Sequence, residues 1–212
     1  MKRNNYAIVS VDMHRGHLDP QVATLPLLPK EKCSRVIKNA AVFFKKAREK
    51  GVPVISVVTL YRDSDEILSN PQWYEKNQDP AATRNGIAKH NIIGQPTNDI
   101  IPELAEQTDY IVNTKKRYSC YLHTELEFLL RQIGAENVIL TGINTSSCVL
   151  CTAFESCNRD FKVYVVEDCC DSMDGPEFHE AAKMLINRIV GHVVSSGEML
   201  KIIEKEECKS GN

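Results

Sequence analysis

Three residue types suited to hydrolytic chemistry stand just after apolar, strand-like runs. Asp12 closes the run at 6–11, Lys115 follows a short run at 109–113, and Cys148 follows a run at 137–141. A cysteine thiolate is a nucleophile, a carboxylate can carry protons, and an ammonium group stabilises either anion. Ligands bind beyond the carboxyl ends of parallel strands, so we expect these three side chains to meet at one site.

The segment 141–148, TGINTSSC, is typical of a turn between a strand and a helix. Cys148 should then lie in the first helical turn, where unpaired amides and the helix dipole lower the pKa of a thiol. The same amides can hold an oxyanion. Two other interpretations stay open: Cys148 is a packed thiol, or it forms a C-x-x-C redox pair with Cys151.

The other two residues carry alternatives of their own. Asp12 is either a proton shuttle, whose pKa partial burial would raise, or a carboxylate that caps a loop. Lys115 and Lys116 are consecutive in an extended stretch, so their side chains point to opposite faces and only one can enter a pocket.

The elements that position these residues alternate along the chain. Helical spacing with end signals, such as a capping-box pairing of Thr124 with Glu127 before Gly134, predicts helices between the strands. This alternation predicts an α/β fold: a three-layer, Rossmann-like single domain over 1–212, with a central parallel six-stranded sheet flanked by helices. The expected strands are 6–11, 54–60, 109–113, 137–141, 162–167 and 192–195, and the expected helices are 31–50, 121–133, 146–158, 176–189 and 198–206.

The segment 61–107 differs from the rest. It is polar, contains Pro71, Pro80 and Pro96, and has weak periodicity. A loop that long in a compact domain is usually functional or disordered. We therefore interpret it as an insertion that covers the substrate, with a solvated excursion as the alternative.

Composition narrows the class of protein. The formal charge of −2 argues against a nucleic-acid partner. The start at residues 1–3 is basic, but Asp12 breaks the apolar run behind it, which is too short for a signal peptide or a membrane span. A cytoplasmic protein with no membrane partner is expected. Eight scattered cysteines then predict free thiols rather than disulfides, and the pair Cys169 and Cys170 is interpreted as packing.

Three sequence blocks carry a resemblance to a known family. They are AIVSVDM at 7–13, KKRYS at 115–119 and TGINTSSCV at 141–149. In this order they resemble the isochorismatase-like cysteine hydrolases, which include nicotinamidases, N-carbamoylsarcosine amidases, ureidoacrylate amidohydrolases and biuret hydrolases. The likeness runs from Tyr6 to about Ile189.

The resemblance implies roles for individual residues. Asp12 matches the acid/base and Cys148 the nucleophile, and the lysine two before Arg-Tyr-Ser selects Lys115 over Lys116. It also implies a cis peptide at Ile143–Asn144, which would aim the backbone amides of Asn144 and Cys148 at an oxyanion. The expected activity is cleavage of a C–N bond in a small amide or ureido substrate, by a homodimer or homotetramer.

The chain departs from the family at several positions. His14 and His17 stand where many members have Gln and Phe, and His17 is a candidate substrate contact, as are Arg62, Trp73, Tyr118 and Tyr121. Arg62 or Arg84 could bind a carboxylate with two hydrogen bonds. Metal-binding nicotinamidases carry an Asp-x-His and further histidines after the second strand, whereas the next histidine here is His90. We therefore expect no metal and no cofactor, and a nicotinamidase is disfavoured.

Two further functions are weighed against this one. Members that hydrolyse the vinyl ether of isochorismate lack a nucleophilic cysteine, so Cys148 counts against that activity. A non-catalytic redox sensor would use Cys148 and Cys151 as a reversible pair, but the complete set of Asp12, Lys115 and Cys148 argues against it.

Overall fold

The computed structural model describes residues 5–25 and 28–209, and side chains as far as residue 206. The basic start at 1–3 and the side chain of Cys208 lie outside the described parts. Within those parts, none of the helices combines the length and the apolar run that a membrane crossing needs. The other seven cysteines are free thiols.

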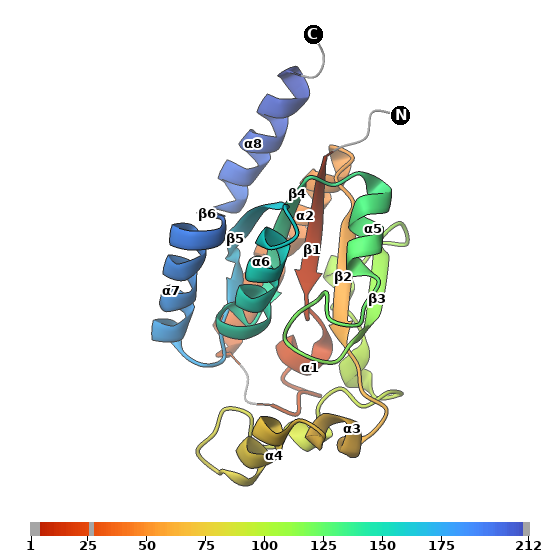
Figure 1. The fold of residues 1–212 in the computed structure, drawn as a ribbon, viewed down its shortest axis with the longest axis vertical. Helices are drawn as coiled ribbons and strands as arrows, with labels where there is room; N and C mark the ends of the chain where they lie inside the picture. Colours follow the sequence, from red (N-terminus) through yellow and green to blue (C-terminus); the bar gives the residue numbers. More distant parts are fainter. Residues whose placement is uncertain (1–4, 26–27, 210–212) are drawn as a thin grey trace.

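A single sheet occupies the centre of the molecule (Figure 1). In the described part of the chain it has six strands in the order β3-β2-β1-β4-β5-β6, all parallel. This confirms the predicted fold class. The strands are β1 (Tyr6–Val11), β2 (Val54–Thr59), β3 (Tyr110–Lys115), β4 (Asn137–Ile143), β5 (Lys162–Asp171) and β6 (His192–Val194).

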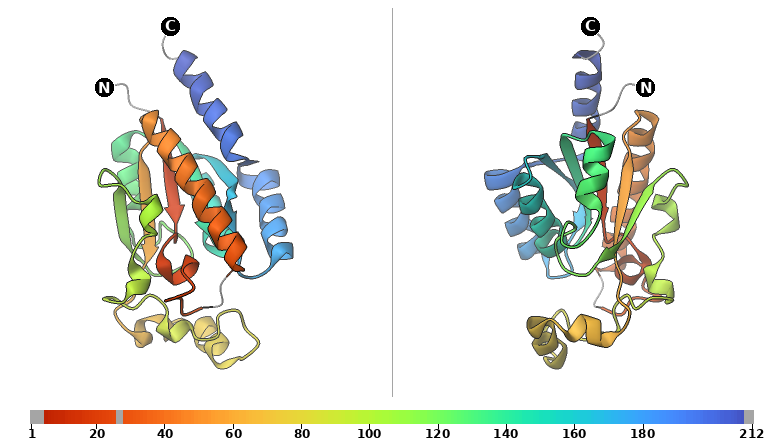
Figure 2. Two further views of the ribbon diagram at one scale, coloured as in Figure 1. Left: turned by 180° about the vertical axis from the view of Figure 1, so that it is seen from behind. Right: turned by 45° about the vertical axis from the view of Figure 1, so that its right-hand side comes forward.

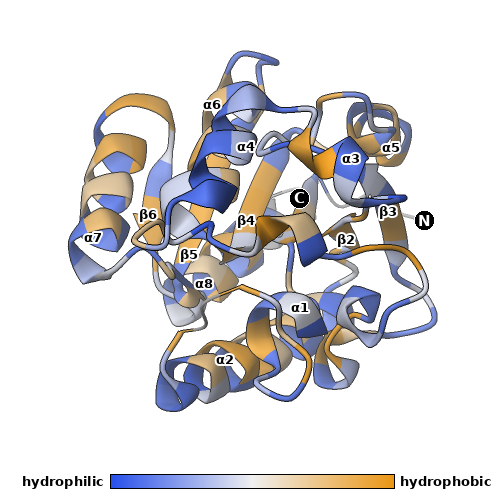
Figure 3. Ribbon diagram, turned by 90° about the horizontal axis from the view of Figure 1, so that it is seen from below, coloured by the Kyte–Doolittle hydropathy of each residue, from blue (hydrophilic) through white to orange (hydrophobic). Residues whose placement is uncertain are grey.

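Helices cover both faces of the sheet (Figure 2). One face is covered by α2 (Lys30–Glu49) and α8 (Ser196–Lys209), which also contact each other. The other face is covered by α5 (Leu126–Ile133), α6 (Leu150–Cys157) and α7 (Pro176–Leu185), the last continuing into a π-helical turn at Ile186–Val190. Seen from below, the sheet lies between these two layers (Figure 3).

Side chains along β1 alternate between two hydrophobic cores, one on each face of the sheet. Tyr6 and Ile8 pack into the core under α2, whereas Ala7, Val9 and Val11 pack into the core under α5 and α6. All six residues of this strand are buried, as expected of a parallel strand covered on both faces.

The segment 61–107 is not a plain loop. It forms two short helices, α3 (Ser64–Leu68) and α4 (Pro71–Gln78), and 3-10 turns at Ile87–Lys89, Pro96–Asn98 and Pro102–Leu104. With the short helix α1 (Arg15–Leu18), α3 and α4 lie beyond the carboxyl ends of the strands (Figure 1). Short helices escape periodicity analysis because one or two turns hold too few residues to show a pattern.

Some predicted boundaries are wrong. α5 begins five residues later than expected, and the capping box is absent: the Thr124 hydroxyl donates to Cys120 O and accepts from Leu126 N. β5 runs four residues beyond its predicted end, so the buried pair Cys169 and Cys170 belongs to the strand itself. The expectation that both pack inside is confirmed.

Candidate active site

The structure brings Asp12, Lys115 and Cys148 into contact. Nζ of Lys115 donates to Asp12 Oδ2 at 2.6 Å and to Cys148 Sγ at 3.4 Å. Nζ also donates to the Thr59 hydroxyl at 2.6 Å, and both the hydroxyl and the backbone N–H of Thr59 donate to Asp12 Oδ1 at 2.8 Å. One ammonium group thus links the carboxylate to the sulfur, and Thr59 fixes the carboxylate from the other side.

Local backbone geometry explains how these groups reach one point. Asp12 directly follows β1 and adopts a φ of 51°, a left-handed conformation that Asp tolerates better than most residues. Gly142 in β4 has a φ of 115°, and a Cβ atom there would lie 2.0 Å from Val11 O. Only glycine lets β4 approach β1 this closely beside the site.

The nucleophile lies where the segment between β4 and α6 turns. The Ile143–Asn144 peptide is cis, and a π-helical turn at Thr145–Val149 leads into α6. The Asn144 carbonyl accepts from the N–H groups of Ser147 and Val149 and skips that of Cys148. The geometry is compatible with the expected oxyanion contact of the Cys148 amide.

Burial and charge determine the protonation of the three groups. Asp12 is fully buried, which alone would raise its pKa, but the charge and hydrogen bond of Lys115, together with His17 and His14, outweigh burial and hold the pKa well below its usual range. Burial opposes the charge on Lys115, yet Asp12 and Cys148 keep the pKa of its ammonium well above the usual value. The resting site therefore holds an ionised carboxylate and a protonated amine.

The expected lowering of the Cys148 pKa is wrong. Burial raises the pKa of this thiol to about 11, because the nearby Asp12 carboxylate adds to the desolvation and Lys115 compensates only in part. The sulfur sits deeper than a helix terminus at the surface, since only 7% of the residue is exposed. The raised pKa favours the protonated thiol over the thiolate before substrate binds.

Lys115 and Lys116 point to opposite sides of the chain, as predicted. Lys116 points away from the site, where Nζ bonds to Leu60 O and, at 3.1 Å, to Glu66. This leaves Lys115 as the lysine in the pocket. Cys151, the second member of the C-x-x-C, is a partly exposed free thiol outside the cavity lining.

A cavity of about 40 Å³ lies beside Cys148, Lys115 and Asp12. The wall contributed by the 61–107 segment is aromatic, apolar and cationic. The remaining lining residues are His17, Leu25, Thr59, Tyr61, Trp73, Arg84, Ile87, His90, Arg117, Tyr118, Asn144 and Ser147.

Several of the predicted substrate contacts line this cavity: His17, Trp73, Arg84 and Tyr118. The guanidinium of Arg84 already binds a carboxylate of the chain itself, Asp174, with two hydrogen bonds. Its charge is therefore neutralised before any ligand arrives.

Two predicted contacts lie elsewhere. Arg62 precedes α3, and its exposed side chain pairs on the surface with Glu66 of that helix. Tyr121 is buried in the core under α6, where its hydroxyl shares a 2.8 Å hydrogen bond with Ser156. Neither residue lines the cavity.

Sequence reasoning missed Thr59, Tyr61 and Arg117 as site residues. Thr59 ends β2 and Tyr61 follows it, at the same sheet edge as Asp12, so position alone could have found both. Arg117 is two residues beyond Lys115, and its guanidinium lies 4.9 Å from the centre of the Trp73 ring. No periodicity marks such a contact, because the segment after β3 is irregular.

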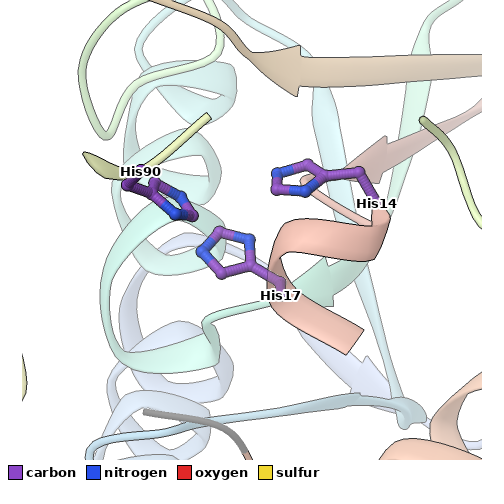
Figure 4. A group of neighbouring side chains, drawn as sticks. All are labelled: His14, His17 and His90. Atoms are coloured by element: carbon purple, nitrogen blue, oxygen red, sulfur yellow. The ribbon is translucent and has the colours of Figure 1, made fainter. Parts of the chain in front are cut away.

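The prediction of no metal used only the segment after the second strand. In space, however, His14 and His17 lie next to His90 (Figure 4). These three imidazoles are the residues here that could hold an ion, since Asp12 is engaged with Lys115 and Thr59.

Comparisons with known proteins agree with this architecture. Residues 6–198 match the sequence model of the isochorismatase domain. Ureidoacrylate amidohydrolase RutB of Agrobacterium fabrum is 24% identical over 97% of this chain and 92% of its own. Maleamate amidohydrolase of Pseudomonas putida is 25% identical over 92% and 85%. A cysteine hydrolase from Pseudomonas syringae pv. phaseolicola superposes with a TM-score of 0.79 at 20% identity, covering 97% of this chain and 95% of that one, and shares the fold. The chain belongs to the isochorismatase family.

Proposed function

We propose that this chain is a cysteine-dependent amidohydrolase that cleaves a C–N bond of a small amide or ureido acid. One observation carries the proposal: Lys115 Nζ contacts both the Asp12 carboxylate and the Cys148 sulfur at the wall of a small cavity. The relatives named as ureidoacrylate and maleamate amidohydrolases support the same class of reaction.

The charges define the order of events. Because the Cys148 thiol keeps its proton at rest, its transfer to Asp12 accompanies formation of the S–C bond. The backbone amides of Asn144 and Cys148 stabilise the oxyanion, and Lys115 stays protonated beside it. Asp12 then gives the proton to the departing nitrogen as the C–N bond breaks. Asp12 then takes a proton from water, which attacks the carbonyl carbon of the remaining thioester or thiocarbamate. As the C–S bond breaks, Asp12 returns this proton to the Cys148 sulfur.

The cavity favours a substrate that carries a negative charge. Lys115 is paired with Asp12, and Arg84 with Asp174, which leaves Arg117 as the cation with spare capacity among the described lining residues. Arg117 bonds only to neutral oxygens, the carbonyl of Lys116 and the hydroxyl of Ser69. Its guanidinium can therefore donate hydrogen bonds to a carboxylate of the substrate.

Release of ammonia from a panel of primary amides and N-carbamoyl acids tests the reaction. Cys148→Ala should abolish turnover, whereas the matched variant Cys151→Ala, outside the cavity, should keep it. Turnover that survives in Cys148→Ala would refute the nucleophile.

A second comparison tests the acid preference. A charged hydrogen bond contributes about 1.5–3 kcal/mol, so Arg117→Gln should raise KM for a carboxylate substrate roughly 10- to 150-fold. Arg62→Gln removes a surface arginine and should leave KM unchanged. Equal effects of the two variants would exclude Arg117 from substrate binding.

A cytoplasmic location and a homodimer or homotetramer complete the proposal. The seven unpaired thiols of the described side chains suit a reducing compartment. Cell fractionation and light scattering of the purified protein test the two points, and a monomer in solution would contradict the second.

A further inference from the structure

His14, His17 and His90 form a buried cluster beside the catalytic residues. His14 directly precedes the short helix α1 and His17 lies within it, and His90 follows the 3-10 turn at Ile87–Lys89 in the insertion. One ring nitrogen of each lies within 4.8 Å of those of the other two, and each side chain is at most 8% exposed. Figure 4 shows the three rings gathered at one point.

Hydrogen bonds identify the nitrogen that carries a lone pair in two of the rings. Nδ1 of His17 lies 3.2 Å from the Asp12 carbonyl, which only accepts, so Nδ1 carries the proton and Nε2 is free to donate its lone pair. Nε2 of His14 accepts from the amide nitrogen of Asn91 at 2.7 Å, so this Nε2 is unprotonated.

His90 is compatible with the same pattern. Its Nδ1 lies 3.3 Å from the Thr24 hydroxyl, which both donates and accepts, and where Nδ1 donates, Nε2 carries the lone pair. His17 and His90 then hold Nδ1 in a hydrogen bond and turn Nε2 to the cluster or cavity, whereas the lone pair of His14 is on the nitrogen that Asn91 now contacts. Histidine ligands of metals have the arrangement of His17 and His90, with the remote nitrogen bonded to a carbonyl, carboxylate or hydroxyl.

We propose that His14, His17 and His90 bind a divalent first-row transition metal ion, such as Zn²⁺ or Co²⁺, next to the nucleophile. Three neutral imidazoles are a donor set suited to these ions. The ionised Asp12 carboxylate, 3.9 Å from His14 Nε2, would complement the positive ion.

The distances between the histidine nitrogens need only a small adjustment for a metal ion to bind. With Zn–N bonds of about 2.1 Å, ligand nitrogens of a tetrahedral site lie roughly 3.4 Å apart. Ring nitrogens that are now as much as 4.8 Å apart would approach by up to about 1.4 Å, and the ion would replace Asn91 as the partner of His14 Nε2. Asn91 keeps its second bond, to Thr59 O at 3.0 Å.

The ion would be accessible from the substrate cavity. His17 and His90 line the same cavity as Cys148, whereas His14 lies behind them. An oxygen or nitrogen of the ligand could then take a remaining coordination position. The donors come from the segment after β1 and from the insertion, not from the Asp-x-His segment after the second strand that marks nicotinamidases. The inference rests on the histidines and does not depend on the proposed hydrolysis.

Titration of the chelator-treated full-length protein with Co²⁺ tests the site without substrate. We expect one ion per chain by equilibrium dialysis, ligand-field absorption in the visible range, and a higher melting temperature with the ion. His90→Gln should weaken binding at least 100-fold and remove the thermal shift. The matched variant His192→Gln changes an exposed histidine on β6 and should bind as the wild type does.

A further variant distinguishes metal binding at the histidine cluster from metal binding at the Cys148 thiol. Cys148→Ser should still bind the ion. If Cys148→Ser lost the ion while His90→Gln still bound it, the ion would be bound by the sulfur and the proposal would be overturned. Binding below one ion per chain in the wild type, or equal binding in His90→Gln and His192→Gln, would also overturn it. Should His90→Gln not fold, His17→Gln and the thermal shift of the wild type decide.

Discussion

Replacing Asp12 with asparagine separates two effects that this carboxylate has on Cys148. As a proton acceptor in turnover, Asp12 helps the sulfur attack. As a fixed negative charge in the resting enzyme, it opposes formation of the thiolate and contributes to the raised pKa of about 11. Asp12→Asn keeps the shape, removes the charge, and should therefore abolish hydrolysis while making the free thiol more acidic.

The size of the effect follows from the geometry. Lys115 Nζ lies 2.6 Å from Asp12 Oδ2 and 3.4 Å from Cys148 Sγ, so the carboxylate and the sulfur are at most about 6 Å apart. At an effective dielectric constant of about 20, two unit charges at that distance repel by about 3 kcal/mol, or roughly two pKa units. Removal of the charge should thus lower the pKa from about 11 to roughly 9.

The rate of alkylation by iodoacetamide reports this change. Near neutral pH the thiolate fraction should rise about 100-fold, but each thiolate becomes roughly tenfold less reactive as its pKa falls. We therefore expect alkylation of Cys148 about ten times faster in Asp12→Asn than in the wild type. The rate of the wild type should keep rising with pH toward 11.

Intact mass with peptide mapping assigns the modified thiol, and Cys148→Ser gives the background from the other cysteines. Slower or unchanged alkylation in Asp12→Asn would refute the reasoning, because it would mean that the carboxylate generates the thiolate at rest. Turnover retained in that variant would remove Asp12 from the proton transfers.

Three further predictions concern stability and the corrected residues. Gly142→Ala should lower the free energy of unfolding by about 2–4 kcal/mol, measured in urea, because its Cβ would meet Val11 O at 2.0 Å, whereas Gly197→Ala, with open space around it, should change little. Tyr121→Phe loses the hydrogen bond to Ser156 and should cost about 1 kcal/mol of stability with KM unchanged, and a raised KM would restore Tyr121 as a substrate contact. The depressed pKa of Asp12 stabilises the fold above its ordinary pKa of 3.8, and this stability is lost as the pH falls through that value toward the folded pKa. The gap in unfolding free energy between wild type and Asp12→Asn should therefore shrink on acidification, and a constant gap would contradict the charge pairing.

Much of the site could be predicted from the sequence because parallel strands align their carboxyl ends. Asp12 follows β1, Lys115 ends β3 and Cys148 lies in the turn after β4, and the sheet order β3-β2-β1-β4 places those strand ends side by side. The prediction needed only strand positions, which apolar runs reveal well. The meeting of the three side chains at 2.6 and 3.4 Å follows from topology rather than from any local signal.

Side-chain direction and burial depth could not be predicted in this way. Arg62 and Arg84 both belong to the polar insertion, yet one faces solvent and the other lines the cavity. A helix terminus alone predicts the wrong direction for the pKa shift of Cys148, because the depth of the sulfur and the nearby carboxylate follow from the tertiary structure. The histidine cluster escaped notice because His90 is more than seventy residues from its neighbours in space.

Folding alone does not explain the charged part of this site. Asp12 and Lys115 are 0% and 1% exposed, and burying each charge costs several kcal/mol that the ion pair only partly offsets. An apolar pair of similar volume at the ends of β1 and β3 would often fold as well or better. Both the N–H and the hydroxyl of Thr59 donate to the same carboxylate, that of Asp12. The end of β2 therefore stabilises a charged side chain that is excluded from water. Such an arrangement is useful where charge must develop on a bound ligand, because fixed groups in a dry cavity need not reorganise during the reaction.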